Sequence, residues 1–383
     1  MRKHFLLRLL ALLLGLTLVA AACGSDDDDE STDGGETAED TDDGGDTDDG
    51  GDTDDGGDSD DEADSEDTVE ATQGGDTIQT IIDRGFLKCG VNGQLLGFSN
   101  VEDDGSYTGL DVDYCKAVAA ALLDDPEAVE YTDLTAETRF TALQSGDIDV
   151  LIRNGTWTSS RDGALGLQWA ATTFYDGAGM LVNSDSGFTE VADMDGTIIC
   201  VQTGTTTEIN LEIYFDNLGI SYEPLNVADE AAVTSNFGSG ACDGYVTDKS
   251  GLASFKATYD GDVTILPDTM SKEPLGPATR EGDDDFFDVV QWTVFATFNA
   301  EEFGIDSTNV QDFIGSDNGA IAKFLNDEES GLAFPTADWA VRIIEAVGNY
   351  QEIYDRNIAP LGIPEGVNQL YTQGGILYGP PVN

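Results

Sequence analysis

Residues 149–161 read DVLIRNGTWTSSR, and they combine a short apolar strand with a loop rich in hydrogen-bond donors. The strand is predicted at 149–152, and Arg161 closes the loop. The donors are the backbone amides and side chains of Asn154, Gly155, Thr156 and Thr158. A guanidinium binds a carboxylate through two parallel hydrogen bonds, and glycine lets the backbone approach closely. The stretch therefore predicts a carboxylate site. A surface ion pair of Arg161 in a very acidic chain is the alternative.

Strands and helices alternate on both sides of this stretch, in two similar series. The first series has predicted strands at 86–91, 129–134 and 148–152, with helices at 110–123 and 137–144. The second has predicted strands at 197–201, 222–225 and 245–247, with helices at 206–218 and 229–237. Two such β-α-β-α-β series predict an α/β protein with two parallel-sheet lobes.

Ligands of open α/β sheets bind beyond the carboxyl ends of the strands. This rule selects the loops 92–99, 153–161 and 202–207 and the position of Asp248. The sequence QTGTTT at 202–207 opens a helix whose free N–H groups favour an anion, although Thr203 or Thr205 as a plain N-cap is the alternative. Asp248 can hold an ammonium group, or it can cap the helix that starts at Lys249. An arginine and an aspartate on opposite lobes fit the two charges of an α-amino acid.

Residues 1–22 have the layout of a signal peptide. A basic start precedes an apolar run at 9–19, which is too short to span a bilayer permanently. Three alanines then stand directly before Cys23, an arrangement that resembles a bacterial lipobox. The resemblance implies cleavage before Cys23 and a lipid on its sulfur. An ordinary signal peptide with a chance cysteine is the alternative.

The segment from Cys23 to residue 75 is an acidic low-complexity stretch. Residues 24–75 contain 25 acidic residues and no Lys or Arg. Such a segment cannot bury enough apolar surface to offset its ordering entropy, so it is predicted to be a disordered linker that acts as a tether. A calcium-binding repeat is a weaker interpretation, because the spacing matches neither the EF-hand loop nor the glycine-rich nonapeptide.

The charge and histidine content of the remaining chain exclude several functions. Residues 76–383 carry 51 acidic and 13 basic residues, a net charge of −38, which argues against nucleic acid as a partner. The only histidine is His4, in the predicted signal segment. Catalytic triads and zinc sites that require histidine are therefore excluded from the mature chain. We expect no metal and no cofactor.

Four cysteines lie in residues 76–383, at Cys89, Cys115, Cys200 and Cys242. An even number in an exported chain indicates two disulfides, for which three pairings are possible. The separation into an early and a late pair favours Cys89–Cys115 and Cys200–Cys242. A four-cysteine metal site is the alternative, but no CxxC spacing supports it.

Several long stretches of the chain resemble one known family. They are RGFLKCGV (84–91), GLDVDYCKAVAAALLDDP (109–126), RFTALQSGDIDVLIRNGTWTSSRD (139–162), ICVQTGTTTE (199–208), CDGYVTDKSGL (242–252), SKEPLGPATREGDD (271–284) and VGNYQEIYDRN (347–357). Together they resemble bacterial extracellular solute-binding proteins of the polar amino-acid type, solute-binding protein family 3. Within that family they are most similar to the general L-amino-acid-binding proteins of ABC importers.

The resemblance implies a periplasmic-binding-protein fold of type II. Two α/β lobes would be joined by two hinge strands, near 175–182 and 270–280, and would close around a ligand. Lobe 1 would comprise 76–178 and 279–383, and lobe 2 would comprise 179–278.

The resemblance also implies a ligand site. Arg161, Asn154 and Thr156 would bind the α-carboxylate of an amino acid, and the second lobe would add Gly204, Thr205 and Thr206. Asp248 would bind the α-ammonium group. The side-chain pocket would be formed by Asn92, Leu95, Phe98 and Trp157, with Tyr175 as a further candidate. Leu95 stands where many relatives have an aromatic residue, which favours a broad pocket.

The expected function is that of a substrate-binding lipoprotein of an amino-acid ABC importer. Its partners would be L-amino acids and the permease subunits, and it would contact the membrane through its lipid anchor only. We expect a monomer at the extracellular face of the cytoplasmic membrane or in the periplasm, and no enzymatic activity. A dehydratase or lyase on the same fold and a chemosensory binding protein are the alternatives.

Overall fold

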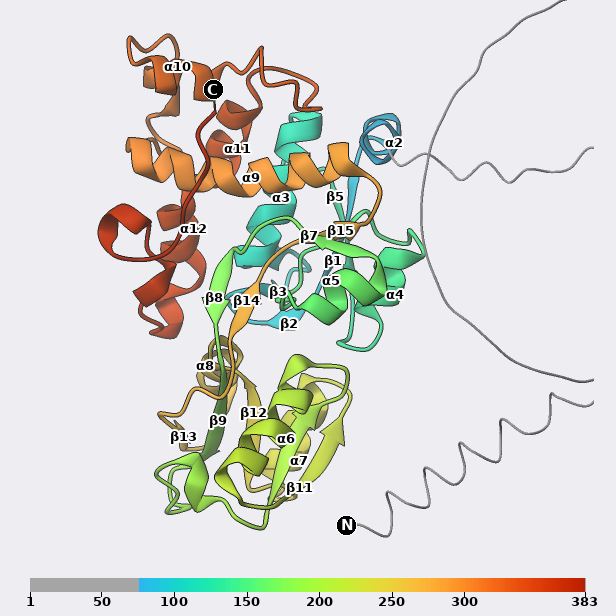
Figure 1. Cartoon of the computed structure of the whole chain (residues 1–383), viewed down its shortest axis with the longest axis vertical. Helices are drawn as coiled ribbons and strands as arrows, with labels where there is room; N and C mark the ends of the chain where they lie inside the picture. The colour runs from blue at the N-terminus through green and yellow to red at the C-terminus, as the bar shows by residue number, and fades with distance from the viewer. Residues whose placement is uncertain (1–75, 383) are drawn as a thin grey trace, which may run out of the picture. The chain divides into compact units, whose positions relative to one another are not determined.

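The computed structural model describes residues 76–382, which contain two lobes, each built on a five-stranded sheet (Figure 1). The predicted signal peptide, Cys23 and the acidic linker up to residue 75 lie outside the described residues. Within the described part of the chain, none of the helices has the length and apolar character needed to cross a membrane.

Lobe 1 is built on the sheet with the strand order β5-β1-β6-β15-β7. Its strands are β1 (Leu87–Val91), β5 (Val129–Asp133), β6 (Val150–Leu151), β7 (Leu167–Trp169) and β15 (Ala278–Arg280). β1 pairs in parallel with β5 and β6, as the β-α-β-α-β series predicts, whereas β15 pairs antiparallel with β6 and β7. A separate small sheet contains β2 (Gln94–Leu95), β3 (Ser99–Val101) and β4 (Tyr107–Thr108).

Lobe 2 repeats this plan in the sheet with the strand order β11-β10-β12-β9-β13. Its strands are β9 (Ala178–Asn183), β10 (Thr197–Gln202), β11 (Tyr222–Val227), β12 (Gly244–Asp248) and β13 (Val263–Ile265). β10 pairs in parallel with β11 and β12, and β9 pairs antiparallel with β12 and β13. Both sheets are therefore mixed, because antiparallel strands extend the predicted parallel core.

Helices cover the faces of both sheets. In lobe 1 they are α2 (Thr77–Arg84), α3 (Leu110–Leu123), α4 (Arg139–Gln144), α5 (Ser159–Leu165), α9 (Asp284–Phe303), α10 (Gly319–Leu325), α11 (Trp339–Val347) and α12 (Tyr350–Asn357). In lobe 2 they are α6 (Thr206–Leu218), α7 (Glu230–Gly238) and α8 (Lys249–Thr258). Short 3-10 turns are η1 (Val191–Asp193), η2 (Val310–Phe313), η3 (Ala359–Leu361), η4 (Gly366–Asn368) and η5 (Tyr371–Gln373). The bounds of α3 and α6 are those predicted.

The core of lobe 1 brings helices from both ends of the described chain together. α3 is buried along most of its length and packs against α9 and α11. The apolar residues of α9, including Phe286 and Phe298, belong to the same core cluster. The hydroxyl groups of Tyr114 on α3 and Thr297 on α9 lie 3.0 Å apart and satisfy each other in this core.

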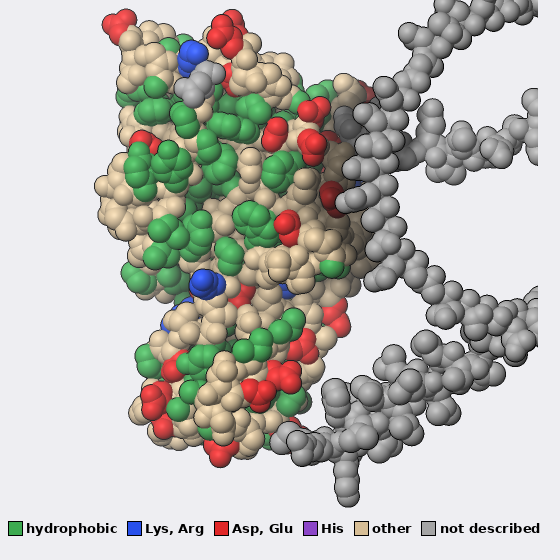
Figure 2. Space-filling model, viewed as in Figure 1, with side chains coloured by type: hydrophobic (Ala, Val, Ile, Leu, Met, Phe, Trp, Pro, Cys, Tyr) green, Lys and Arg blue, Asp and Glu red, His purple; other side chains and the backbone are tan. Residues whose placement is uncertain are grey.

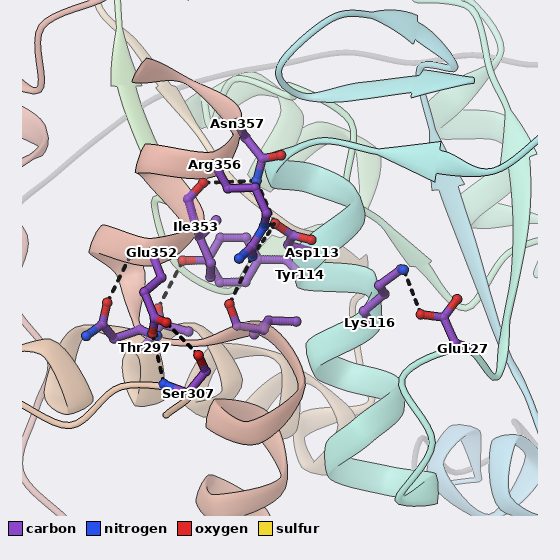
Figure 3. Close-up of polar contacts among 12 residues, drawn as sticks. Asp113, Tyr114, Lys116, Glu127, Thr297, Ser307, Glu352, Ile353, Arg356 and Asn357 are labelled. Atoms are coloured by element: carbon purple, nitrogen blue, oxygen red, sulfur yellow. Dashed lines mark hydrogen bonds and ion pairs between the residues drawn. The ribbon is translucent and has the colours of Figure 1, made fainter. Parts of the chain in front are cut away.

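Polar contacts hold α12 against α3 (Figure 3). Arg356 donates to Asp113 through Nε and Nη2, at 3.1 and 2.7 Å, and Asn357 donates to the same carboxylate at 2.6 Å. At the start of α12, the side chains of Asn349 and Glu352 form a capping box, and Glu352 also accepts from Ser307. These contacts position the C-terminal part of the chain on lobe 1.

Two short strands connect the lobes. β8 (Phe174–Asp176) and β14 (Glu273–Leu275) pair antiparallel and run side by side between the two sheets (Figure 1). Tyr175 lies opposite Pro274 in this ribbon, and its free backbone groups bond the side chain of Asn368. The Tyr175 N–H donates to Asn368 Oδ1 at 2.7 Å, and Asn368 Nδ2 donates to the Tyr175 carbonyl at 3.1 Å.

Two disulfides are present, each within one lobe. Cys89 on β1 is joined to Cys115 on α3, and Cys200 on β10 is joined to Cys242, just before β12. This is the pairing that the sequence favoured. All four cysteines are buried. One disulfide thus ties β1 to helix α3, and the other ties β10 to the segment that precedes β12.

Acidic side chains are spread over both lobes on the face drawn in Figure 2, where lysine and arginine are sparse. This distribution agrees with the excess of acidic residues in the sequence. Such a surface favours solubility and opposes binding of polyanions.

Candidate functional site

The loop after β6 is fixed by contacts to the core of lobe 1. Asn154 has a positive φ of 25°, and its N–H donates to the buried carboxylate of Asp111 at 2.8 Å. The Asn154 side chain accepts a hydrogen bond from Asn92 Nδ2 at 3.3 Å. The Gly155 carbonyl accepts from Trp169 Nε1 at 3.2 Å. These contacts give the loop one defined conformation ahead of Thr156.

Arg161 lies in the first turn of α5, whose N-cap is Thr158. Its guanidinium is buried, donates from Nη1 to the Thr156 carbonyl at 2.9 Å and lies 5.0 Å from the centre of the Phe140 ring. Burial lowers the pKa of Arg161, and the nearby carboxylates of Glu273 and Asp248 oppose this shift. The structure thus buries the Arg161 cation near two carboxylates and does not place it in an ion pair on the surface.

The N-terminus of α6 in lobe 2 faces this loop. The hydroxyl groups of Thr156 and Thr206 lie 3.3 Å apart across the two lobes. Thr205 is the N-cap: its hydroxyl accepts from the Glu208 N–H at 3.1 Å and donates to the Gln202 carbonyl at 2.8 Å. The capping alternative for Thr205 is therefore observed. The remaining N–H groups of the first turn have no acceptor within the helix, which favours a nearby anion.

Asp248 ends β12 and is buried, with an exposed fraction of 7%. It occupies the N-cap position of α8, as the helix-cap alternative has it, but its side chain makes no capping hydrogen bond to the helix. Burial, reinforced by the carboxylates of Asp176 and Glu273, raises the pKa of Asp248 well above its ordinary value. The guanidinium groups of Arg139 and Arg161 act in the opposite direction. A cationic group beside Asp248 would relieve this cost.

Glu273 was not predicted from the sequence, yet it lies at the centre of the contacts between the lobes. The residue is fully buried on β14, and four side chains donate hydrogen bonds to its carboxylate. Oε2 accepts from Thr156 at 2.6 Å and Thr206 at 2.8 Å, and Oε1 accepts from Asn210 at 3.0 Å and from Ser271. Two residues predicted for the ligand carboxylate therefore contact a carboxylate of the protein in this structure.

Arg139, at the start of α4, is a second buried charge that was not predicted. Its Nη2 lies 3.5 Å from the Gly204 carbonyl in lobe 2, and its Nε has no hydrogen-bond partner among the described residues. The guanidinium lies 4.7 Å from the centre of the Phe140 ring. Burial is the main cause that lowers the pKa of Arg139, and the cations Arg153 and Arg161 lower it further.

A small cavity of about 110 Å³ lies between the lobes. Asn92 and Arg153 line it from lobe 1, and Gln202 and Glu230 line it from lobe 2. Burial lowers the pKa of Arg153 to about 10 and raises the pKa of Glu230 to about 7. Ligand pockets commonly measure roughly 300–1,000 Å³, so this cavity is smaller than a usual ligand pocket.

The other residues predicted for the side-chain pocket have different surroundings. Leu95 and Phe98 belong to the core cluster of lobe 1, and Phe98 packs edge-on against Phe174 at 5.5 Å. Trp157 is 44% exposed. Tyr175 lies on the ribbon between the lobes and lines a separate cavity of about 750 Å³. Of the four residues Asn92, Leu95, Phe98 and Trp157, Asn92 alone lines the small cavity between the lobes.

A sequence signal for Glu273 and Arg139 exists, although it is weak. Arg139 is the only charged residue in RFTALQ, whereas Glu273 directly follows Lys272 in SKEPLG. Full burial of such residues usually requires partners, which makes them candidates for a functional site. Among residues 76–382, no group of three or more His, Cys, Asp or Glu is arranged to hold a metal ion.

Two α/β lobes joined by a narrow ribbon, with residues of opposite charge type buried in each lobe, define a two-lobed binding protein. Residues 87–359 match the family model of bacterial extracellular solute-binding proteins, family 3, and the chain belongs to this family.

Characterised relatives agree with this assignment. The chain is 46% identical over 318 residues to the general L-amino acid-binding periplasmic protein AapJ of Rhizobium johnstonii, covering 80% of this chain and 92% of that protein. It is 45% identical over 321 residues to the glutamate/glutamine/aspartate/asparagine-binding protein BztA of Rhodobacter capsulatus, covering 82% of this chain and 95% of that protein. Among solved structures, an ABC transporter periplasmic binding protein from Brucella ovis with glutathione bound is 45% identical and has a TM-score of 0.78. The match covers 80% of this chain and 99% of that chain.

These comparisons confirm the family resemblance and the two-lobed fold class that the sequence predicted. The relatives are named as binding proteins, which confirms the prediction that the chain is not an enzyme. The family assignment also agrees with a location outside the cytoplasm.

Proposed function

We propose that this protein captures free L-amino acids between its two lobes, with broad specificity, and delivers them to the permease of an ABC importer. The observation that carries the proposal is the pair Arg161 and Asp248, two buried and oppositely charged residues on facing lobes. Their charges complement those of an α-amino acid. The names of the relatives from Rhizobium and Rhodobacter support this class of ligand.

In this proposal, Arg161 binds the α-carboxylate, and the free N–H groups at the start of α6 add hydrogen bonds. Since the hydroxyl protons of Thr156 and Thr206 are directed to Glu273, backbone amides are better donors to the ligand than these hydroxyl groups. Asn154, Gly204 and Thr205 then shape the loops that present these amides. This arrangement uses the guanidinium fork and the helix N-terminus together.

The α-ammonium group is assigned to Asp248. An ammonium ion stabilises the ionised form of this carboxylate, whose charge is otherwise opposed by burial and by Asp176 and Glu273. Broad specificity is supported by neutral polar groups such as Asn92 and Gln202 at the cavity. The Brucella relative with bound glutathione suggests including that peptide among the ligands tested.

The boundaries of lobe 2 at residues 179 and 278 and the lipid anchor at Cys23 are part of the same proposal. A lipidated Cys23 followed by the acidic linker 24–75 would tether the protein to the extracellular face of the cytoplasmic membrane as a monomer. Lipidation is tested by detergent phase partitioning of the parent and the Cys23→Ser variant. We expect the parent in the detergent phase and the variant in the aqueous phase. Partition of both into the aqueous phase contradicts the anchor.

The binding site is tested by calorimetric titration of a panel of L-amino acids and glutathione. Removal of one partner from a buried charge pair commonly costs about 3–5 kcal/mol, or about two to three powers of ten in affinity. We therefore expect Arg161→Ala and Asp248→Ala each to weaken binding by this factor. Arg356→Ala is the matched control, because it removes a guanidinium that contacts Asp113 on α3.

The outcomes separate the two parts of the proposal. Saturable binding by the parent and by the Arg356→Ala control, with loss in both site variants, supports it. Parental affinity in Arg161→Ala and Asp248→Ala means that the site is elsewhere. If the parent binds no member of the panel, the ligand class is wrong.

A further inference from the structure

The contacts of Glu273 connect three separate parts of the chain. Thr156 belongs to the loop after β6 in lobe 1, Thr206 and Asn210 belong to α6 in lobe 2, and Ser271 precedes β14 in the ribbon. We call these five residues the Glu273 junction. Thr156 is 117 residues from Glu273 in the sequence, and Thr206 is 67 residues away.

The four donors use the whole hydrogen-bonding capacity of the carboxylate. A carboxylate has about four lone-pair positions on its two oxygens. Two of them face the hydroxyl groups of Thr156 and Thr206, and the other two face Asn210 and Ser271. Glu273 therefore has no free acceptor for a ligand ammonium group, so its role is distinct from that of Asp248.

The charge of Glu273 is not neutralised by direct contact with a basic side chain. Within the described residues, its carboxylate forms no ion pair at 4.0 Å or less. Since the side chain is fully buried, the four hydrogen bonds replace the water that an ionised carboxylate would otherwise bind. Loss of donors from one lobe would leave part of this charge without hydrogen bonds until water entered.

We propose that Glu273 is a positioning residue that joins the two lobes in their closed arrangement and couples ligand binding to closure. This inference rests on the proposed function for the identity of the ligand, but the junction itself does not. In this structure the hydroxyl groups of Thr156, from lobe 1, and Thr206, from lobe 2, both donate to Oε2. The junction thereby places the Arg161 loop and the N-terminus of α6 on either side of the ligand.

The first test measures amide hydrogen exchange in the full, ligand-free chain, so it needs no ligand. Glu273→Gln replaces an acceptor oxygen with a donor and removes the charge. We expect faster exchange in both the loop 153–158 and the first turns of α6, at 206–211. Glu281→Gln is the matched control, because Glu281 is exposed near the same ribbon.

A second variant keeps the test informative if Glu273→Gln folds poorly. Thr156→Val removes one hydroxyl in lobe 1 at nearly constant volume. The junction predicts that this change accelerates exchange in lobe 2 at 206–211, while exchange in helix α10, which packs against α11 and η2, is unchanged. A purely local structural role would confine the effect to residues near Thr156, and that result would overturn the inference.

The coupling to ligand is tested by titrating L-glutamine and L-glutamate into the same variants. We expect Glu273→Gln and Thr156→Val to weaken binding by about tenfold or more, with unchanged affinity in Glu281→Gln. Parental affinity in both junction variants would contradict coupling, even if exchange increased. Absence of binding by the parent would refute the proposed ligands, and the exchange experiment would still decide whether the junction joins the lobes.

Discussion

Amino-acid binding should depend on pH through Asp248. In the ligand-free protein, burial and the carboxylates of Asp176 and Glu273 raise the pKa of Asp248, so this group holds a proton at pH values where an ordinary aspartate is ionised. An ammonium group binds the ionised form. Binding therefore releases a proton, and the affinity rises as the pH rises toward the ligand-free pKa of Asp248.

The size of the effect follows from mass action for a single site. Below the ligand-free pKa of Asp248, each further decrease of one pH unit weakens binding by up to about tenfold, which corresponds to about 1.4 kcal/mol. Since Asp176 also carries a raised pKa and interacts with Asp248, the slope belongs to the pair and can be shallower than one proton. The Asp176→Asn variant removes a carboxylate that repels the negative charge of Asp248. The plot of affinity against pH should therefore shift to lower pH in this variant.

Titration calorimetry with L-glutamine between about pH 5 and pH 7 measures this slope, while the ligand keeps its ammonium charge. Repeating the titration in buffers with different ionisation enthalpies counts the protons released. Asp248→Asn should bind weakly and release none. An affinity that is constant across this range in the parent, or a slope that persists in Asp248→Asn, would refute the assignment of the ammonium group to Asp248.

Three further outcomes are expected. Burial raises the pKa of Asp111 to about 6, so the folded chain retains a proton that the unfolded chain loses near pH 4. The free energy of unfolding should therefore fall by up to about 3 kcal/mol from pH 4 to 7, as measured by urea unfolding. This decrease should be lost in Asp111→Asn and kept in Asp103→Asn, a control at an exposed position. Arg139→Met should raise the midpoint temperature of unfolding in scanning calorimetry, because it removes a buried guanidinium whose Nε lacks a partner among the described residues. An unchanged or lower midpoint temperature contradicts this. Asn368→Ala should destabilise the ribbon by about 1–2 kcal/mol and accelerate amide exchange at Tyr175, whereas parental exchange there would show that the two hydrogen bonds contribute little.

The elements that the sequence predicted well are those with local signals. α3 and α6 have the predicted bounds, and α6 ends at Gly219, which adopts a positive φ of 71° as a helix C-cap. The parallel strands β1, β5 and β6 follow from the alternation of apolar strands and helices. Arg161 and Asp248 were predicted because each follows a strand of a repeated unit, at the edge where such sheets bind ligands.

The remaining features depend on contacts that the sequence does not display. β15 has only three residues, and its antiparallel position depends on the return of the chain from lobe 2. The role of Glu273 depends on donors up to 117 residues away. For apolar residues in loops, periodicity cannot distinguish a pocket wall from the core. Phe98 and Trp157 were predicted together, but one is fully buried and the other is 44% exposed.

Each edge of the β8 and β14 ribbon is contacted by another part of the chain. A two-stranded ribbon has two open edges, and exposed edges can recruit strands from other molecules. Here one edge is occupied by the side-chain amide of Asn368 at Tyr175, and the other by the Trp157 N–H, which donates to the Pro274 carbonyl at 2.9 Å. These contacts occupy the outward-facing backbone groups of Tyr175 and Pro274, so we expect them to disfavour the addition of a strand from another molecule at these positions. One of these protecting groups, Asn368, lies beyond residue 359, where the match to the family model ends.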